Sequence, residues 1–217
     1  HVGAKGDRRG LEPIGGDTTI TGASLVQWTP AHASFEVAQA NPGLAGLLDQ
    51  TLGSSWRLDL DQLKRLKENS RSSAFRDEFL RIKRANKLRL AEHVKRSTGV
   101  TLDPQSLFDV QVKRIHEYKR QLLNVLHVVT RYQAMLAAPN APWVPRSVVF
   151  AGKAASSYQM AKTIIRLIHD VGQVVNNDPR IAGRLKVAFI PNSGVSVAAL
   201  TIPGADLSEQ ISPAGTA

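Results

Sequence analysis

The stretch from Lys113 to Arg120 carries side chains that suit the binding of an oxyanion. Two lysines and two arginines supply positive charge (Lys113, Arg114, Lys119 and Arg120), and His116, Glu117 and Tyr118 lie between them. An arginine can donate two parallel hydrogen bonds to neighbouring oxygens, whereas a lysine supplies a mobile point charge. This combination is best suited to a phosphate group, so we expect an anion site in this stretch.

A strand and a helix on either side of the stretch are expected to position it. Before it, apolar residues at 108, 110 and 112 alternate with Asp109 and Gln111, which is the period of a strand with one buried face. After it, apolar residues as far as Leu136 recur at helical spacing. Open α/β sheets bind ligands beyond the carboxyl ends of their strands, so these basic residues lie where a ligand is expected.

A solvated start of the helix is the alternative interpretation of these basic residues. Cations at a helix N-terminus oppose the helix dipole, so a purely structural role would favour Asp or Glu there. The anion site is therefore the favoured hypothesis. A histidine that stands alone, as His116 does, is more often a structural or substrate-orienting residue than an acid–base group.

Other motifs give weaker signals. Gly152 and Lys153 follow an apolar run at 147–151 but lack the Walker spacing, so we expect only a tight passage from strand to helix near a ligand. The histidines have no carboxylates at metal-ligand spacing, and the chain has no cysteine. We therefore predict no metal site and no disulfide.

The composition is typical of a soluble chain that can bury a core. Of its 217 residues 42% are hydrophobic, and the net charge of +10 raises nucleic acid, anionic membranes and phosphorylated substrates as partners. The charge forms no continuous block, so nucleic acid is not favoured. The sequence contains no apolar run long enough to span a bilayer and no signal-peptide pattern, which predicts a cytoplasmic protein.

The pattern divides the chain into three segments. Residues 1–37 are glycine-rich without persistent periodicity and are expected to be irregular or disordered. Residues 38–104 carry apolar stripes at helical spacing and are expected to form a helical segment. Residues 105–217 alternate between strand and helix patterns, which predicts an α/β, Rossmann-like parallel sheet with flanking helices.

The stretch Val-Gln-Val-Lys-Arg-Ile-His-Glu-Tyr-Lys-Arg-Gln-Leu-Leu-Asn at 110–124 resembles the signature of the glycogen and maltodextrin phosphorylases. These α-1,4-glucan phosphorylases are pyridoxal-phosphate enzymes. Residues 75–77, 82–87 and 205–212 resemble further segments of the family, and the likeness extends from about Gln39 to the end. The resemblance implies a two-domain GT-B-type glycosyltransferase fold, of which 105–217 would be part of the C-terminal cofactor domain.

In that family, the basic residues of the signature surround the phosphate of pyridoxal 5'-phosphate and the attacking inorganic phosphate. The resemblance implies that Lys113 binds the cofactor phosphate and that Arg114 and Lys119 act as catalytic residues on the substrate phosphate. His116 and Tyr118 would line the glucosyl side. The implied substrates are inorganic phosphate and an α-1,4-glucan, and the implied product is glucose 1-phosphate. Full-length members are usually homodimers.

The sequence also departs from the family pattern. The Schiff-base lysine of the family would follow the motif at 205–212 beyond Ala217, and the large N-terminal domain would precede this chain. Ser193-Gly194 and Ala199-Leu200 stand where family members have Tyr-Arg and Glu-Lys. We therefore expect a fragment of a phosphorylase that is inactive alone. The alternative is a non-catalytic, basic Rossmann-like module that binds nucleic acid or another polyanion, with a steep salt dependence.

Overall fold

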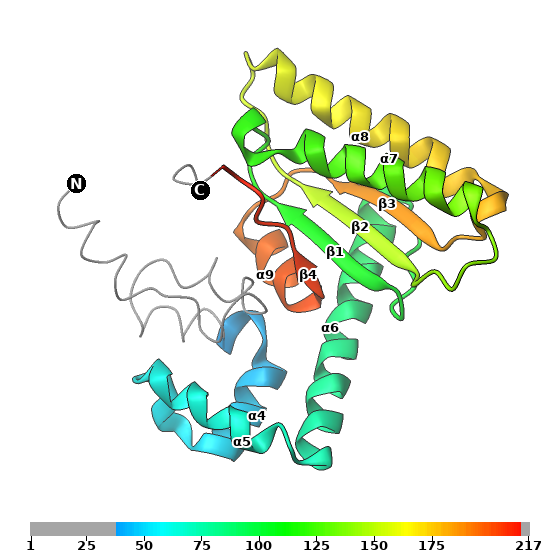
Figure 1. Cartoon of the computed structure of the whole chain (residues 1–217). Coiled ribbons are helices and arrows are strands. Elements are labelled where there is room, and N and C mark those ends of the chain that lie inside the picture. Colours follow the sequence, from blue (N-terminus) through cyan, green and yellow to red (C-terminus); the bar gives the residue numbers. More distant parts are fainter. Residues whose placement is uncertain (1–37, 214–217) are drawn as a thin grey trace. The chain divides into compact units, whose positions relative to one another are not determined.

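The computed structural model of the chain describes residues 38–213 (Figure 1). The prediction for residues 1–37 falls outside this range. The chain divides into two compact units, of which the first ends at Asn86 and the second begins at Lys87. This boundary lies within the long helix α6 (Ser73–Thr98).

The first unit is helical, as expected. Its further elements are α4 (Pro42–Leu52), the 3-10 helices η3 (Ser54–Arg57) and η4 (Leu60–Arg65), and α5 (Leu66–Asn69). The Asn41 side chain accepts a hydrogen bond from the Leu44 amide, and Pro42 takes the first helical position, where no hydrogen-bond donor is needed. Leu48, Leu52 and Trp56 are buried and form a small core of their own.

The second unit contains a four-stranded sheet in which every pairing is parallel. Its strands are β1 (Leu107–Val112), β2 (Arg146–Ala151), β3 (Leu185–Ile190) and β4 (Leu207–Ser208). Their spatial order is β3-β2-β1-β4. The predicted α/β fold with a parallel sheet and flanking helices is therefore confirmed.

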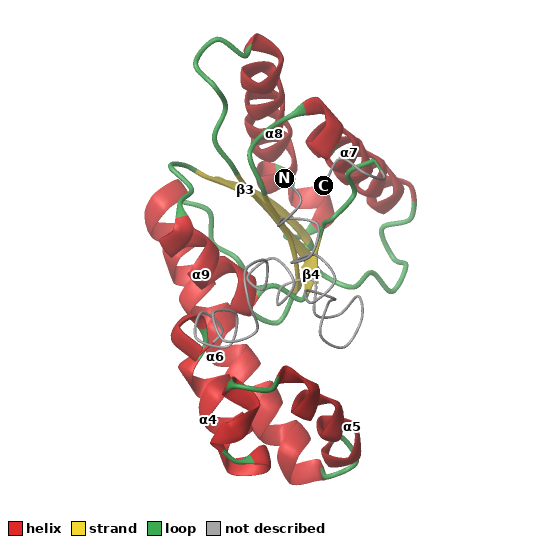
Figure 2. Ribbon diagram, turned by 90° about the vertical axis from the view of Figure 1, so that its left-hand side faces the viewer, coloured by secondary structure: helices red, strands yellow, loops and turns green. Residues whose placement is uncertain are grey.

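Helices cover both faces of this sheet (Figure 2). On one face α7 (Gln121–Ala137) and α8 (Gln159–Asn177) pack against side chains such as Val148, Phe150 and Val187. On the other face the end of α6 packs against Phe108, Val110 and Val149, and α9 (Val195–Gly204) lies alongside it. The two cores are separated by the sheet, as is usual for parallel strands.

The prediction that β1 has only one buried face is wrong. Asp109 and Gln111, which were expected to face solvent, are 0% and 1% exposed. They lie under α7, and each has a polar partner there: Asp109 binds Arg146, and Gln111 binds Asn124. Burial of a polar side chain is tolerated when it is hydrogen-bonded, so a polar position in a strand is no proof of a solvated face.

Strand β4 pairs with β1 through a bulge. The Asp206 amide donates to Phe108 O at 2.9 Å, and the Glu209 amide donates to Val110 O at 2.8 Å. Three residue steps on β4 thus oppose two on β1, which is the count of a β-bulge. The bulge brings the side chain of Glu209 towards the polar face of β1, where it interacts with Asp109.

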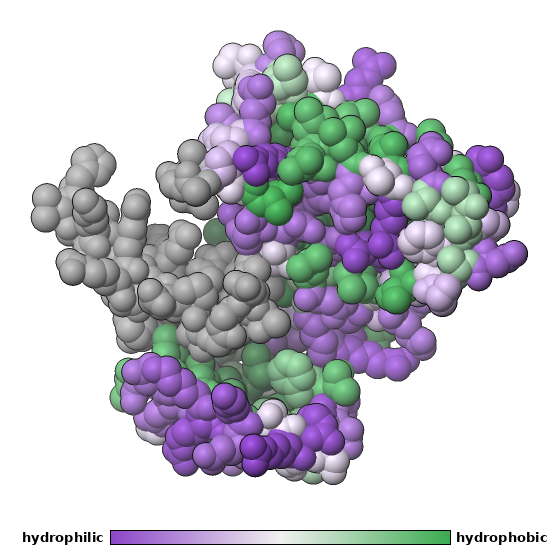
Figure 3. Space-filling model, in the orientation of Figure 1, coloured by the Kyte–Doolittle hydropathy of each residue, from purple (hydrophilic) through white to green (hydrophobic). Residues whose placement is uncertain are grey.

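The outer face of α7 carries an apolar patch. Leu122, Leu123 and Leu126 are between 41% and 51% exposed, and apolar residues are visible over this helix in the space-filling view (Figure 3). Among the described residues, no helix is both long and apolar enough to cross a bilayer.

Candidate functional site

The five predicted site residues lie on one loop that follows β1 and precedes α7 (Figure 1). We call residues 113–119 the basic loop; it includes the short 3-10 helix η5 (Glu117–Lys119). After β1, the chain adds β2 and then β3 on one side of that strand. It then returns and adds β4 on the other side, which gives the order β3-β2-β1-β4. The basic loop therefore lies at the topological switch point, beyond the carboxyl end of β1, where such sheets bind ligands.

The basic loop carries the three predicted cations, Lys113, Arg114 and Lys119. Lys113 is half-buried, and its pKa is lowered by this burial and by the nearby positive charge of Lys119. Lys119 Nζ lies 4.7 Å from the centroid of the Tyr118 ring, and Arg114 is exposed. Between residues 38 and 213, none of the three forms an ion pair with a carboxylate. Neighbouring cations without counter-charges are a suitable environment for a bound anion.

Aromatic rings gather at the basic loop beside Lys119. The ring of His116 lies 4.3 Å from that of Tyr118 and 5.1 Å from that of Tyr158, centroid to centroid. The structure thus brings the two predicted glucosyl-side residues together and adds Tyr158 to them. This third ring comes from the connection between β2 and α8, and the sequence analysis did not single it out.

A hydrogen-bonded pair ties these two loops together. The Tyr158 hydroxyl donates to Glu117 Oε2 at 2.5 Å and accepts a bond from the Glu117 amide at 3.3 Å. The bond to the Glu117 carboxylate raises the pKa of the Tyr158 hydroxyl. The Glu117 carboxylate therefore hydrogen-bonds Tyr158, and among the described residues it forms no ion pair with the cations of its own loop.

Gly152 allows the basic loop to approach the end of β2. A Cβ atom at this position would lie 2.2 Å from Lys113 O and 2.7 Å from Ile115 Cδ1. Backbone pairing continues past the strands here, because the Lys113 amide donates to Ala151 O and the Ile115 amide donates to Lys153 O. The predicted tight passage from strand to helix is wrong, because residues 152–158 separate β2 from α8. Gly152 instead permits the close approach of the Lys113 backbone.

Three buried amide side chains lie beneath the basic loop. Gln111, Gln121 and Asn124 are between 0% and 2% exposed, and two of them hydrogen-bond the loop's backbone. The sequence analysis missed all three. The signals that were available were a polar residue inside β1, Gln111, and two amides in the first turn of α7, Gln121 and Asn124.

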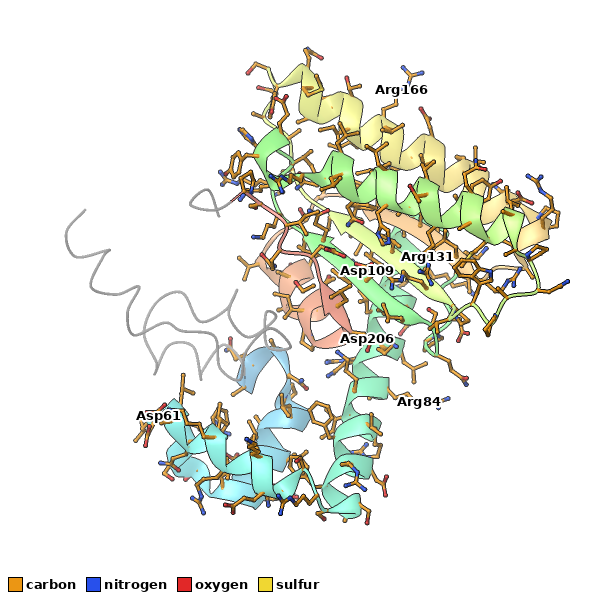
Figure 4. The ribbon with its side chains drawn as sticks, in the orientation of Figure 1. Asp61, Arg84, Asp109, Arg131, Arg166 and Asp206 are labelled. Atoms are coloured by element: carbon orange, nitrogen blue, oxygen red, sulfur yellow. The ribbon has the colours of Figure 1, made fainter. Side chains whose placement is uncertain are left out.

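A second polar cluster lies farther down the same face of β1 (Figure 4). Asp109 Oδ2 accepts a hydrogen bond from Arg146 Nη1 at 2.8 Å, and Arg131 and His127 of α7 lie near enough to interact with Asp109 electrostatically. Burial raises the pKa of Asp109. Burial and the neighbouring Asp109 carboxyl also raise the pKa of Glu209, to about 7. The two carboxyl groups therefore share one main counter-charge, that of Arg146.

Two adjoining cavities, of about 270 and 610 Å³, open at the β3 edge of the sheet. Thr98, Gln173 and Asn176 line both, and none of the five predicted site residues lines either. The described part of the chain contains no group of three or more His, Asp or Glu residues that could hold a metal ion. The five predicted site residues therefore lie outside both cavities.

Comparison with known proteins gives one consistent family. The sequence model of the family "Carbohydrate phosphorylase" matches residues 35–217. Glycogen phosphorylase of Haemophilus influenzae is 59% identical over 180 residues, which is 83% of this chain and 22% of that protein. Glycogen phosphorylase of Pasteurella multocida is 54% identical over 180 residues, which is again 83% of this chain and 22% of that protein. The human muscle form is 51% identical over 176 residues, 81% of this chain and 21% of that protein. The chain thus spans about a fifth of the length of these relatives.

Proposed function

The chain belongs to the carbohydrate phosphorylase family, and we propose that its basic loop binds the phosphate groups of an α-1,4-glucan phosphorylase reaction. The reaction is the transfer of a terminal glucosyl unit from glycogen or maltodextrin to inorganic phosphate, with glucose 1-phosphate as product. The observation that carries the proposal is the position, at the switch point of the sheet, of three cations that form no ion pair with any carboxylate of the described residues.

Arg114 and Lys119 are assigned to the inorganic phosphate. Arg114 is exposed at the loop surface and can donate two parallel hydrogen bonds to a tetrahedral anion. Lys119 lies against the Tyr118 ring, which holds the ammonium group on the side of the aromatic cluster. Both charges would stabilise the phosphate as it attacks the anomeric carbon and the glycosidic bond breaks.

His116 and Tyr118 are assigned to the glucosyl unit. Their rings pack together beside the cations, so a sugar at this place would contact an aromatic surface and the imidazole edge while phosphate occupies the basic side. The described residues provide only this one side of such a site.

Lys113 is assigned to the phosphate group of pyridoxal 5'-phosphate. A half-buried lysine that lies near a second lysine, and that pairs with no carboxylate in the described part of the chain, fits a phosphate dianion. When bound, the cofactor would supply a phosphate that exchanges a proton with the substrate phosphate. Lys113 would hold that phosphate group beside Arg114 and Lys119.

Several expectations from the family belong to the same proposal. They are the glucan substrate, the homodimeric assembly of full-length members and a cytoplasmic location. The alternative of a nucleic-acid-binding module is not favoured, because the family match explains the order of the cations in the loop and a general basic charge does not.

Titration with inorganic phosphate, followed by NMR of the ¹⁵N-labelled chain, tests the proposal. We expect the amide signals of the basic loop to shift with a dissociation constant in the millimolar range, which corresponds to a binding free energy of about −4 kcal/mol. Arg114→Ala should weaken binding at least tenfold. Arg166→Ala, on the exposed face of α8 (Figure 4), should leave it unchanged. Equal losses in both variants would show diffuse charge and refute the site.

A further inference from the structure

We propose that Gln111, Gln121 and Asn124 are positioning residues that hold the basic loop in its anion-binding conformation before any ligand is present. This inference rests on the proposed function, because it concerns the same loop. It goes beyond that function by assigning a role to side chains that cannot themselves touch the ligand, since all three are buried.

Gln121 binds the loop on both sides of Ile115. Its Nε2 donates to Arg114 O at 3.1 Å, and its Oε1 accepts from the His116 amide at 3.3 Å. Ile115 itself is buried in the core between the sheet and α7 and α8. One side chain at the first position of α7 thus fixes the backbone next to Arg114 and that of His116.

Gln111 binds the other end of the loop. Its Nε2 donates to Lys119 O at 3.0 Å, and its Oε1 accepts from Asn124 Nδ2 at 3.0 Å. Asn124 therefore orients the Gln111 amide so that its donor faces Lys119. Together, the three amides hold the loop at Arg114, His116 and Lys119, which are three of the five predicted site residues.

The basic loop needs this support because charge repulsion within it and an unfavourable backbone conformation next to it both destabilise a single loop conformation. Lys113 and Lys119 repel each other when no anion is bound; burial, and after it the charge of Lys119, lowers the pKa of Lys113. Arg120, which follows the loop, has φ of 57°, a left-handed conformation that is unfavourable for a residue with a side chain. Hydrogen bonds from buried amides can hold such a backbone in place.

Neutral amides suit this task better than carboxylates would. A carboxylate beneath the loop would pair with the cations and reduce their charge, whereas an amide binds the backbone and leaves the charge for a ligand. A loop that is already in its bound conformation loses less entropy on binding, which increases affinity. The structure thus holds mutually repelling cations in place with uncharged, buried amide side chains.

Gln121→Met tests this role, since methionine has a similar length but cannot form either hydrogen bond. Two measurements are made on the full 217-residue chain: backbone NMR order parameters of the ligand-free basic loop, and affinity for inorganic phosphate. We expect order parameters near 0.85 in the wild type and below about 0.6 in the variant. We also expect phosphate affinity to fall about tenfold.

Asn176→Leu is the matched control. The Asn176 side chain also forms two backbone hydrogen bonds, to Val187 N at 2.9 Å and Val187 O at 2.7 Å, but it does so at the β3 edge of the sheet. This variant should lose stability without a change in loop order or phosphate affinity. Asn124→Ala is a milder variant that removes only the support of Gln111, and it should weaken phosphate binding about threefold.

The outcomes separate this inference from the proposed function. A rigid loop in Gln121→Met, or a mobile loop with unchanged affinity, would overturn the positioning role alone. An equal loss of affinity in Asn176→Leu would also overturn it, because general destabilisation would then suffice. A wild-type chain that binds no phosphate would overturn the proposed function and the positioning role together.

Discussion

Lys87 and Asp206 lie 119 positions apart in the sequence and form an ion pair in which Nζ and Oδ2 are 2.6 Å apart. Lys87 also donates to Ser106 O at 2.7 Å, and the same Asp206 oxygen accepts from the Phe108 amide at 2.8 Å. The pair therefore joins α6, the start of β1 and the start of β4. It places β4 beside β1 and so defines the switch point at which the basic loop lies.

Lys87→Met should lower the free energy of unfolding by about 1–3 kcal/mol, because the Asp206 carboxylate would lose the charge of Lys87 and Ser106 O would lose the hydrogen bond from Lys87. Urea unfolding measures the change. Arg96→Met on the same helix is the control: its pair with Glu92 is about two-thirds exposed on both sides, so its loss should be below about 0.5 kcal/mol. Equal losses would show that the Lys87 pair has no special structural role.

Gly152→Ala should disturb the basic loop directly. The new methyl group would overlap Lys113 O, and neither backbone can move without breaking the pairing between residues 113–115 and 151–153. We expect a loss of about 3 kcal/mol in the free energy of unfolding, together with weaker phosphate binding.

Gly172→Ala is the matched control for this substitution. Its Cβ would lie 3.5 Å from Val187 O, an ordinary contact, and alanine is the better helix former by about 1 kcal/mol. Thermal unfolding of both variants tests the difference. If Gly152→Ala were as stable as the wild type and bound phosphate equally well, the close approach would not constrain the loop.

The pair Asp109 and Glu209 should make stability depend on pH. The pKa of Glu209 is raised from 4.5 to about 7, so the folded state binds this proton more tightly than the unfolded state does. The resulting stabilisation is fully present below the unfolded pKa and is lost as the pH rises through about 7. Because Glu209 is only partly buried, we expect about 1–2 kcal/mol between low and high pH.

Glu209→Gln isolates this effect, because glutamine resembles the protonated carboxyl group and does not titrate. The variant should be more stable than the wild type at about pH 8 and nearly equal to it at about pH 5. Thermal unfolding at both pH values gives the comparison. A wild-type advantage at about pH 8 would mean that the ionised Glu209 is stabilised by Arg146, contrary to this account.

Sequence patterns predicted the scaffold well, because each pattern reflects a local cause. The apolar run at 147–151 lies within β2, and the change of period across residues 113–119 located the boundary between β1 and α7. The position of the five site residues on one loop followed from that boundary.

The support of the site could not be predicted in the same way. Asp109 and Gln111 alternate with apolar residues, and alternation normally indicates a solvated face. Their burial depends on α7 covering this face with Asn124 and on Arg146 reaching it from β2. The Tyr158–Glu117 bond likewise joins positions 41 apart, and neither residue type indicates its partner.

A crystal structure of the chain with arsenate would test the central claim most directly. Arsenate is a tetrahedral anion like phosphate, and its arsenic atom can be located by anomalous scattering. The account predicts one strong anomalous peak within hydrogen-bonding distance of Arg114 and Lys119, with Lys113 beside it and the basic loop unmoved. Peaks only at exposed arginines such as Arg96 and Arg166, with none at the basic loop, would contradict it.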